Sequence, residues 1–195
     1  SRSVWEDALA KGLGLLGINY EERDEPFAGA SGVTHPLISE SVTQFQSQAY
    51  KEMLPPNGPV RTSIVGVETP EVMAQAKRVK DFMNYQLSEV MEEYDQDMDQ
   101  MLFYLPLSGS TFKKVYFDPA MGRQVAAFIP AEDFIVSYGS SDLTSCSRVT
   151  HVMRKTENEV RFLQVNGFYS SVDLGEPGFS KTSIQEKKDK TTGVE

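Results

Sequence analysis

The segment from Thr69 to Phe103 is the feature that most limits how this chain can fold. Apolar side chains recur in it at steps of three and four residues, so the spacing predicts one amphipathic α-helix. Thr69 is a suitable N-cap, and Pro70 and Glu71 suit the first turn. At ~1.5 Å per residue the helix would be on the order of 50 Å long, so it needs a neighbour along its apolar side. The stripe that we expect to pack, in an oligomer or in a core, consists of Val79, Met83, Leu87, Val90, Tyr94 and Met98.

A small β unit is predicted directly after this helix, which we expect Pro106 and Gly109 to end. The segments 111–118 and 123–129 alternate in polarity and flank the turn residues Pro119-Ala-Met-Gly122, which indicates an antiparallel hairpin. Further short strands are expected at 135–138 and 148–154.

Shorter helices complete the expected fold. Periodicity predicts them at about residues 3–16, from Pro36 to just before Pro55, and at 156–165, while 61–67 alternates enough to be a short strand. The fold class is therefore α+β, with a long amphipathic helix and shorter helices packed with a small antiparallel β unit. We expect one domain over residues 1–175 and a polar tail over 176–195, where apolar residues nearly vanish.

Composition excludes several classes of function. The 195 residues carry a net charge of −9, which disfavours a dominant phosphate-binding surface. Cys146 is the one cysteine, so an internal disulfide or a thiolate metal cluster cannot form. No apolar run approaches the ~18 residues of a membrane span, which predicts no membrane contact. The first and last residues suggest an excerpt of a longer protein.

Several motifs resemble catalytic or cofactor sites, but the residues around them lack the features that such sites require. The Gly12–Gly17 segment matches G-x-G-x-x-G, but it lies in a helical pattern and lacks the acid expected about 20 residues later. The Ser108–Lys113 segment lacks the glycine spacing of a phosphate loop. His35 and His151 are the two histidines, and no G-x-S-x-G nucleophile elbow accompanies them. The sequence therefore predicts no enzyme, no cofactor and no metal.

Acidic side chains crowd the second half of the predicted long helix. A calcium loop needs a glycine turn that folds ligands around one point, whereas side chains on a straight helix fan outward. The prediction is a solvated or channel-facing acidic surface. Its members are Glu89, Glu92, Glu93, Asp95, Asp97 and Asp99.

The order of elements resembles the wing region of portal proteins, the head-to-tail connectors of tailed bacteriophages, in the form found in short-tailed phages. The resemblance covers roughly residues 3–175, and it rests on the ordered set because no single motif is specific. The segments that carry it are Gly32–Glu40, Val60–Gly66, Leu105–Gly109, Lys114–Asp118, Phe128–Val136, Arg148–Met153, Glu157–Val160 and Gly167–Tyr169.

This resemblance implies a homo-oligomeric ring, dodecameric in the mature family members, at one vertex of the capsid. Double-stranded DNA would pass through it without sequence-specific binding, during packaging by the terminase and during ejection into the tail. It implies contacts with terminase, capsid and tail adaptor proteins, no enzymatic activity, and a place in the virion after assembly in the host cytoplasm. The alternative is a non-enzymatic α+β interaction module of another virion adaptor or scaffold protein. Ring formation separates the two, and a hydrolase that uses His151 is a third, weaker hypothesis.

Overall fold

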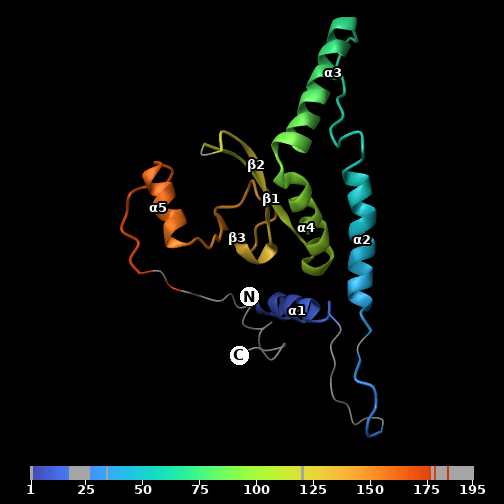
Figure 1. The fold of residues 1–195 in the computed structure, drawn as a ribbon, viewed down its shortest axis with the longest axis vertical. Coiled ribbons are helices and arrows are strands. Elements are labelled where there is room, and N and C mark those ends of the chain that lie inside the picture. The colour runs from blue at the N-terminus through green and yellow to red at the C-terminus, as the bar shows by residue number, and fades with distance from the viewer. Residues whose placement is uncertain are drawn as a thin grey trace. The chain divides into compact units, whose positions relative to one another are not determined.

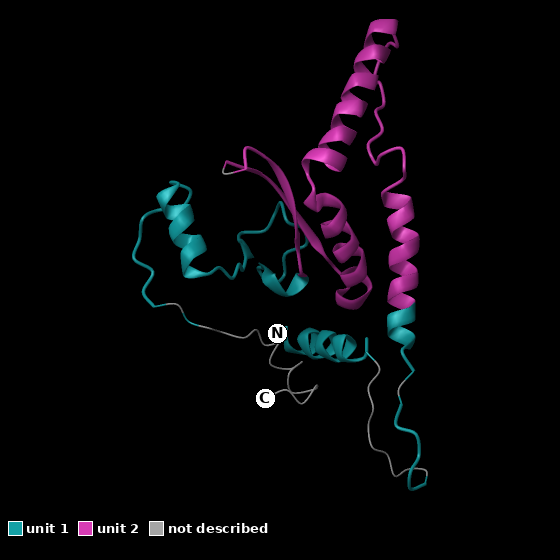
Figure 2. Ribbon diagram, viewed as in Figure 1, with its two compact units in different colours: residues 1–40, 131–195 teal, residues 41–130 magenta. Residues whose placement is uncertain are grey.

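A computed structural model of the chain has the predicted α+β composition. Its described residues form α-helices and two antiparallel two-stranded sheets (Figure 1). The chain divides into two compact units, unit 1 (residues 1–40 and 131–195) and unit 2 (residues 41–130), shown in Figure 2. Most of the predicted tail, 176–195, lies outside the described residues. The structure describes residues 2–17, 27–33, 35–119, 121–176, 178 and 184.

Unit 2 is built from helices followed by a β-hairpin, and helix α2 enters it from unit 1. The elements in chain order are α2 (Leu37–Met53), α3 (Pro70–Tyr85), the π-helical turn η1 (Gln86–Val90), α4 (Glu93–Ser108), β1 (Phe112–Asp118) and β2 (Arg123–Ile129).

The long helix predicted from Thr69 to Phe103 is interrupted, which corrects the prediction of one continuous element. Its start is as expected, because the Val72 N–H donates to Thr69 Oγ1 at 3.3 Å. After Tyr85 the chain widens into η1, and Met91 leaves the helical region with φ −97° and ψ 72°. Met91 is only 3% exposed, so the break turns this side chain into the core. Helices α3 and α4 consequently run in different directions (Figure 1).

The segment 61–67, all of which the structure describes, forms no strand, contrary to the prediction. A strand needs a neighbouring strand with free backbone N–H and C=O groups. Just before this segment, the backbone of Val60 is hydrogen-bonded to the Asn84 side chain instead. Asn84 Oδ1 accepts from the Val60 N–H at 2.9 Å, and Asn84 Nδ2 donates to the Val60 carbonyl at 3.3 Å. Val65 and Val67 are almost fully exposed, so alternation in this segment does not reflect a buried face.

Pro106 does not end α4, whereas Gly109 does. Pro106 lies inside the last turns of the helix, where its missing N–H removes a single intrahelical bond. Gly109 takes the left-handed conformation, with φ +78°, and its N–H donates to the Leu105 carbonyl at 2.9 Å. The helix therefore runs to Ser108, beyond the predicted end.

The left-handed conformation of Gly109 leads to a stability prediction. Gly109→Ala is expected to lower the free energy of unfolding by about 1 kcal/mol, because an added Cβ disfavours positive φ. The Cβ would meet no atom within 4 Å, so the cost is conformational alone. Urea titration measures it. Gly12→Ala, inside helix α1 (Ser3–Gly14) and also with open space, is the control and should stabilise slightly. Equal losses in both variants would contradict this account.

The hairpin and α4 make the core of unit 2, as the hairpin pattern predicts. Strands β1 and β2 pair in register from Phe112 opposite Ile129 to Asp118 opposite Arg123. Helix α4 packs against β2, and the Tyr104 and Phe128 rings lie 5.6 Å apart. The buried apolar side chains of these two elements are Met98, Leu102, Val125, Ala126 and Ile129.

Besides the α1 helix, the described residues of unit 1 form the strands β3 (Phe134–Val136) and β4 (Val149–His151) and the helix α5 (Glu157–Val165), close to the predicted bounds. The β3–β4 ladder pairs Phe134 with His151. Helix α5 begins with a complete capping box between Thr156 and Glu159. A 3₁₀ turn, η2 (Ala131–Asp133), precedes β3, and Arg154 makes a two-bond ion pair with Asp133 at 3.0 and 3.2 Å.

Candidate functional site

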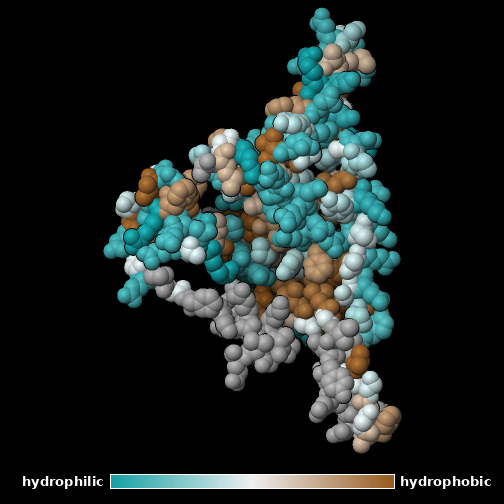
Figure 3. Space-filling model, viewed as in Figure 1, coloured by the Kyte–Doolittle hydropathy of each residue, from teal (hydrophilic) through white to brown (hydrophobic). Residues whose placement is uncertain are grey.

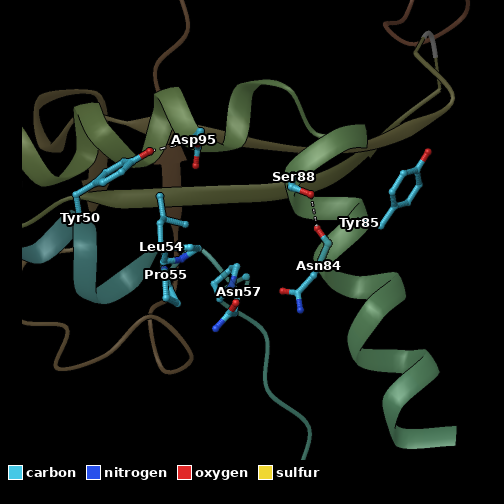
Figure 4. Close-up of a pocket in the computed structure, with 11 residues that line it drawn as sticks. Tyr50, Leu54, Pro55, Asn57, Asn84, Tyr85, Ser88 and Asp95 are labelled. Carbon is cyan, nitrogen blue, oxygen red and sulfur yellow. Dashed lines mark hydrogen bonds between the residues drawn. The ribbon is translucent and has the colours of Figure 1, made fainter. Parts of the chain in front are cut away.

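Helix α3 lacks a buried side chain among its sixteen residues, all of which the structure describes. Its large apolar side chains are between 37% and 60% exposed, and Figure 3 shows apolar atoms on its surface among hydrophilic ones. Most helical stability in proteins comes from packing an apolar face, so an unpacked helix of this length indicates a missing neighbour. Val72, Val79 and Met83 lie on one side of the helix and form what we call the α3 apolar face, and the exposed Met73 and Phe82 flank it on either side.

The predicted packing stripe does not form one face. Val79 and Met83 lie on the α3 apolar face, 47% and 43% exposed. Leu87 and Val90 are half-buried in η1, and Tyr94 is half-buried at the start of α4. Met98 is 5% exposed and belongs to the core with β2. The break at Met91 changes the direction of the helix. Val79 and Met83 therefore remain exposed to a partner, whereas Met98 is buried within unit 2.

Two of the predicted surface acids hold the edge of the hairpin. Glu93 Oε1 accepts from the Ala126 N–H at 3.4 Å, and Asp97 Oδ2 accepts from the Phe128 N–H at 2.8 Å. Residues four apart on a helix, such as Glu93 and Asp97, are separated by about 6 Å. Residues two apart on a strand, such as Ala126 and Phe128, are separated by about 6.8 Å, so each carboxylate lies opposite one N–H group. The carboxylates thereby satisfy strand-edge N–H groups that would otherwise be open.

An ion pair strengthens this attachment. Arg123 Nη1 lies 2.7 Å from Glu93 Oε2, and both side chains are about one quarter exposed. The ammonium of Lys113 also lies 3.8 Å from the centroid of the Tyr94 ring, in a cation–π contact between β1 and α4. Burial lowers the pKa of Lys113, although the charges of Asp97 and Glu93 oppose that shift.

Two other acids on α4 contact α2 instead. The Tyr50 hydroxyl donates to Asp95 Oδ2 at 3.1 Å, and Gln46 Nε2 donates to Asp99 Oδ1 at 2.7 Å. The solvated surface predicted for all six acids is wrong for Glu93 and Asp97, which are only partly exposed and accept hydrogen bonds from β2. Glu89, Glu92, Asp95 and Asp99 are exposed as the sequence predicts, although Asp95 and Asp99 also accept hydrogen bonds from α2.

The Glu93 contacts predict a pH-dependent contribution to stability. Burial alone would raise the pKa of Glu93, but hydrogen bonds from backbone N–H groups and Arg123, with the Arg123 charge, hold it below the ordinary 4.5. A lowered folded-state pKa stabilises the protein at pH values above 4.5, and this stabilisation is lost as the pH falls through the folded-state pKa.

Glu93→Gln is therefore expected to lower the free energy of unfolding by about 1–3 kcal/mol at pH 7, where a charged hydrogen-bond partner of Arg123 is lost. The difference from the wild type should shrink as the pH falls below 4.5 and through the lowered pKa of Glu93. Urea titrations at pH 7 and at a series of lower pH values, with amide exchange at Ala126, measure both effects. The exposed Glu92→Gln is the matched control and should change little at any of these pH values. A constant difference across the pH range would refute the assignment.

Residues considered for catalysis are not brought together. His151 lies in the β3–β4 ladder. Cys146 lies in the loop after β3, where a hydrogen bond from the Ser140 hydroxyl and one from the backbone at Ser137 lower the pKa of its thiol from 9.0 to about 7. The sequence does not indicate this lowered pKa, because the fold of the loop after β3 is what brings Ser140 to the Cys146 thiol. Within the described residues no group of three or more His, Cys, Asp or Glu side chains is placed to hold a metal ion.

The described helices also include none with the length and apolar character needed to cross a lipid bilayer. Comparisons with protein-family models, with curated proteins and with solved structures find no match to this chain.

Proposed function

We propose that this chain is the wing region of a phage portal ring, a structural subunit of the conduit through which double-stranded DNA enters and leaves the capsid. The observation that carries the proposal is the α3 apolar face, which leaves a sixteen-residue amphipathic helix without a buried side chain. In a closed ring, each subunit presents such a face to the next one along. The ordered resemblance of the segments between residues 3 and 175 supports the same assignment.

Charge supports a conduit that lets DNA slide. The net charge of −9 disfavours retention of a polyanion, because strong duplex binding depends on many Lys and Arg contacts with phosphates. The proposal thus expects no sequence-specific contacts with DNA. It also expects partners of the portal kind, namely terminase, capsid and tail adaptor proteins, and no catalysis by the chain itself.

The alternative is an interaction module of another virion adaptor or scaffold protein. The α3 apolar face is also compatible with this alternative, since an adaptor would cover the face with a different protein, whereas the ordered resemblance of the segments favours the portal. The portal and the adaptor differ in what covers the α3 apolar face. In a ring it is a second copy of this chain, and in an adaptor it is an unrelated subunit.

Native mass measurement with negative-stain imaging of the full-length protein that carries this chain tests the proposal. A closed ring with a central hole wide enough for duplex DNA is the expected result. A monomer or dimer that persists at high concentration would overturn the portal assignment in favour of the adaptor. A mobility-shift assay at physiological salt should in addition show no stable complex with a linear duplex, and tight, salt-sensitive binding would contradict the conduit.

A further inference from the structure

The outer edge of strand β1 is open in unit 2. The N–H groups of Ala126 and Phe128 donate to α4, so these two residues of β2 point their backbone groups away from β1. The β1 residues opposite them, Val115 and Lys113, point theirs away from β2 in turn, and Phe117 follows by alternation. No third strand pairs with β1 among the residues that the structure describes. The outward N–H and C=O groups of β1 are therefore available to another strand.

The side chains along this edge do not protect it. A lysine commonly keeps an edge strand from pairing because its charge projects over the edge. The ammonium of Lys113 is instead buried 3.8 Å from the centroid of the Tyr94 ring, on α4. The neighbouring Val115 and Phe117 are 65% and 60% exposed. The β1 edge therefore offers two apolar side chains beside its open backbone groups, whereas two α4 carboxylates close the edge of β2.

A segment that has the sequence of a strand but no partner lies on another side of the same unit. Residues 61–67 alternate in polarity without forming a strand, and Val65 and Val67 are 98% and 83% exposed. Such β-branched side chains favour a pleated, half-buried surface. Thr62 Oγ1 donates to the Ala76 carbonyl at 3.3 Å, which ties the segment to α3. In Figure 1 this segment, between α2 and α3, and the hairpin lie on opposite sides of α3 and α4. Two surfaces so placed meet between copies in a head-to-tail contact.

We infer that residues 65–68 of one copy of this chain add an antiparallel strand to the β1 edge of the next copy, opposite residues 114–117. The occupant is a second copy because the same chain carries both the open edge and the strand-forming segment that lacks a partner. Strand addition of this kind supplies affinity from backbone hydrogen bonds and specificity from alternate side chains. It deepens the proposed function and rests on the head-to-tail assembly that a ring requires.

The exposed apolar side chains match in this register. Val67 lies opposite Val115, and Val65 lies opposite Phe117, which are pairs of the kind that stabilise an antiparallel ladder. All four side chains are more than half exposed in the single chain. Gly66 bends the segment there with φ +116°. Because glycine has no Cβ, it reaches the extended region as readily, so the segment straightens at this one residue when it pairs.

Charge selects the antiparallel direction. In the antiparallel register the carboxylate of Glu68 faces the ammonium of Lys114, and both side chains are exposed. A parallel strand with its valines opposite the same two β1 residues would bring Glu68 beside Asp118. Opposite charges across a ladder stabilise it and like charges destabilise it, so the antiparallel strand is favoured.

Disulfide cross-linking between copies tests this contact in the full-length protein, with Cys146 and any further cysteine replaced by serine. Copies with Val67→Cys are mixed with copies with Val115→Cys and oxidised. Residues opposite each other in such a ladder have Cα atoms about 5.5 Å apart, within reach of a disulfide, so covalent dimers are expected. Either variant alone should give less than a tenth of that yield. Val67→Cys mixed with Met121→Cys, exposed in the hairpin turn, is the matched control and should not cross-link.

Charge reversal tests the direction of the added strand. Lys114→Glu and Glu68→Lys should each weaken self-association about tenfold, because like charges then face each other, and the double variant should restore it. Sedimentation equilibrium measures these changes. Glu71→Lys, exposed in the first turn of α3, is the control for Glu68→Lys, and Lys114→Glu should not restore any loss that it causes. A double variant that stays as weak as the single ones would overturn the antiparallel register.

Imaging of the same cross-linked samples separates this contact from the proposed function. A ring that assembles without the cross-link between positions 67 and 115 would overturn the strand addition and leave the portal assignment standing. Cross-linked copies that never close into a ring would support the strand addition and overturn the portal. The absence of both the ring and the cross-link would overturn both.

Discussion

Val79→Asp and Met83→Asp, alone or together, are expected to prevent assembly of the proposed ring and to leave unit 2 folded. Both side chains are more than 40% exposed on α3, so a carboxylate at either position stays in water in the isolated chain. At a subunit interface the same carboxylate would be buried without a partner, which costs about 3–5 kcal/mol per site. Sedimentation velocity measures assembly, and far-UV circular dichroism measures whether the helices persist.

Ala74→Asp is the matched control for this pair. It introduces the same charge into the same helix, but Ala74 lies on the side opposite Met83 because nine residues turn a helix through two and a half turns. Assembly should therefore survive in this variant. Loss of assembly in all three variants would show that charge on α3, and not its apolar face, governs association. Unfolding of the Val79→Asp chain would show that the face packs within the subunit.

Leu102→Ala is expected to cause the largest loss of stability, about 2–5 kcal/mol in the free energy of unfolding. Leu102 is 2% exposed in α4, the helix that packs against β2, and it belongs to the same core as Met98 and Ile129. Truncation removes buried methyl groups and leaves a cavity that α4 cannot close, because the Glu93 and Asp97 side chains fix this helix to β2. Urea titration, with amide exchange in β2 as a local probe, gives the change.

Met121→Ala provides the comparison within the same unit. Met121 lies in the turn of the hairpin and is 61% exposed, so its truncation should change the free energy of unfolding by less than about 0.5 kcal/mol. Similar losses in the two variants would mean that α4 and β2 do not form the core of unit 2.

Local signals in the sequence were sufficient for much of the secondary structure. Thr156 and Glu159 define the start of α5 by a capping box, and Gly109 ends α4, because each acts on backbone groups within a few residues of itself. The hairpin was also predictable, since its turn and its alternating flanks are contiguous in the chain. The portal assignment, in contrast, rests on the resemblance and stays a prediction.

The break at Met91 illustrates what local patterns miss. Neither glycine nor proline occurs between Pro70 and Met91, and apolar residues continue at helical spacing across the break. Only the burial of Met91 against the rest of unit 2 distinguishes two helices from one. The alternating polarity of residues 61–67 predicted a strand that does not form. A strand exists only where another strand pairs with its backbone, and the local sequence does not show whether such a partner is present.

The sequence by itself determined the α+β class, the positions of most helices, the hairpin and the acidic balance, because these depend on composition and on neighbours in the chain. Only the tertiary structure decided which acids meet partners and which apolar residues remain exposed. Glu93 and Asp97 contact β2 while Asp95 and Asp99 contact α2, although all four look alike in the sequence. The physical reason is that a helix presents each side chain in one direction, and the element that lies in that direction comes from a distant part of the chain.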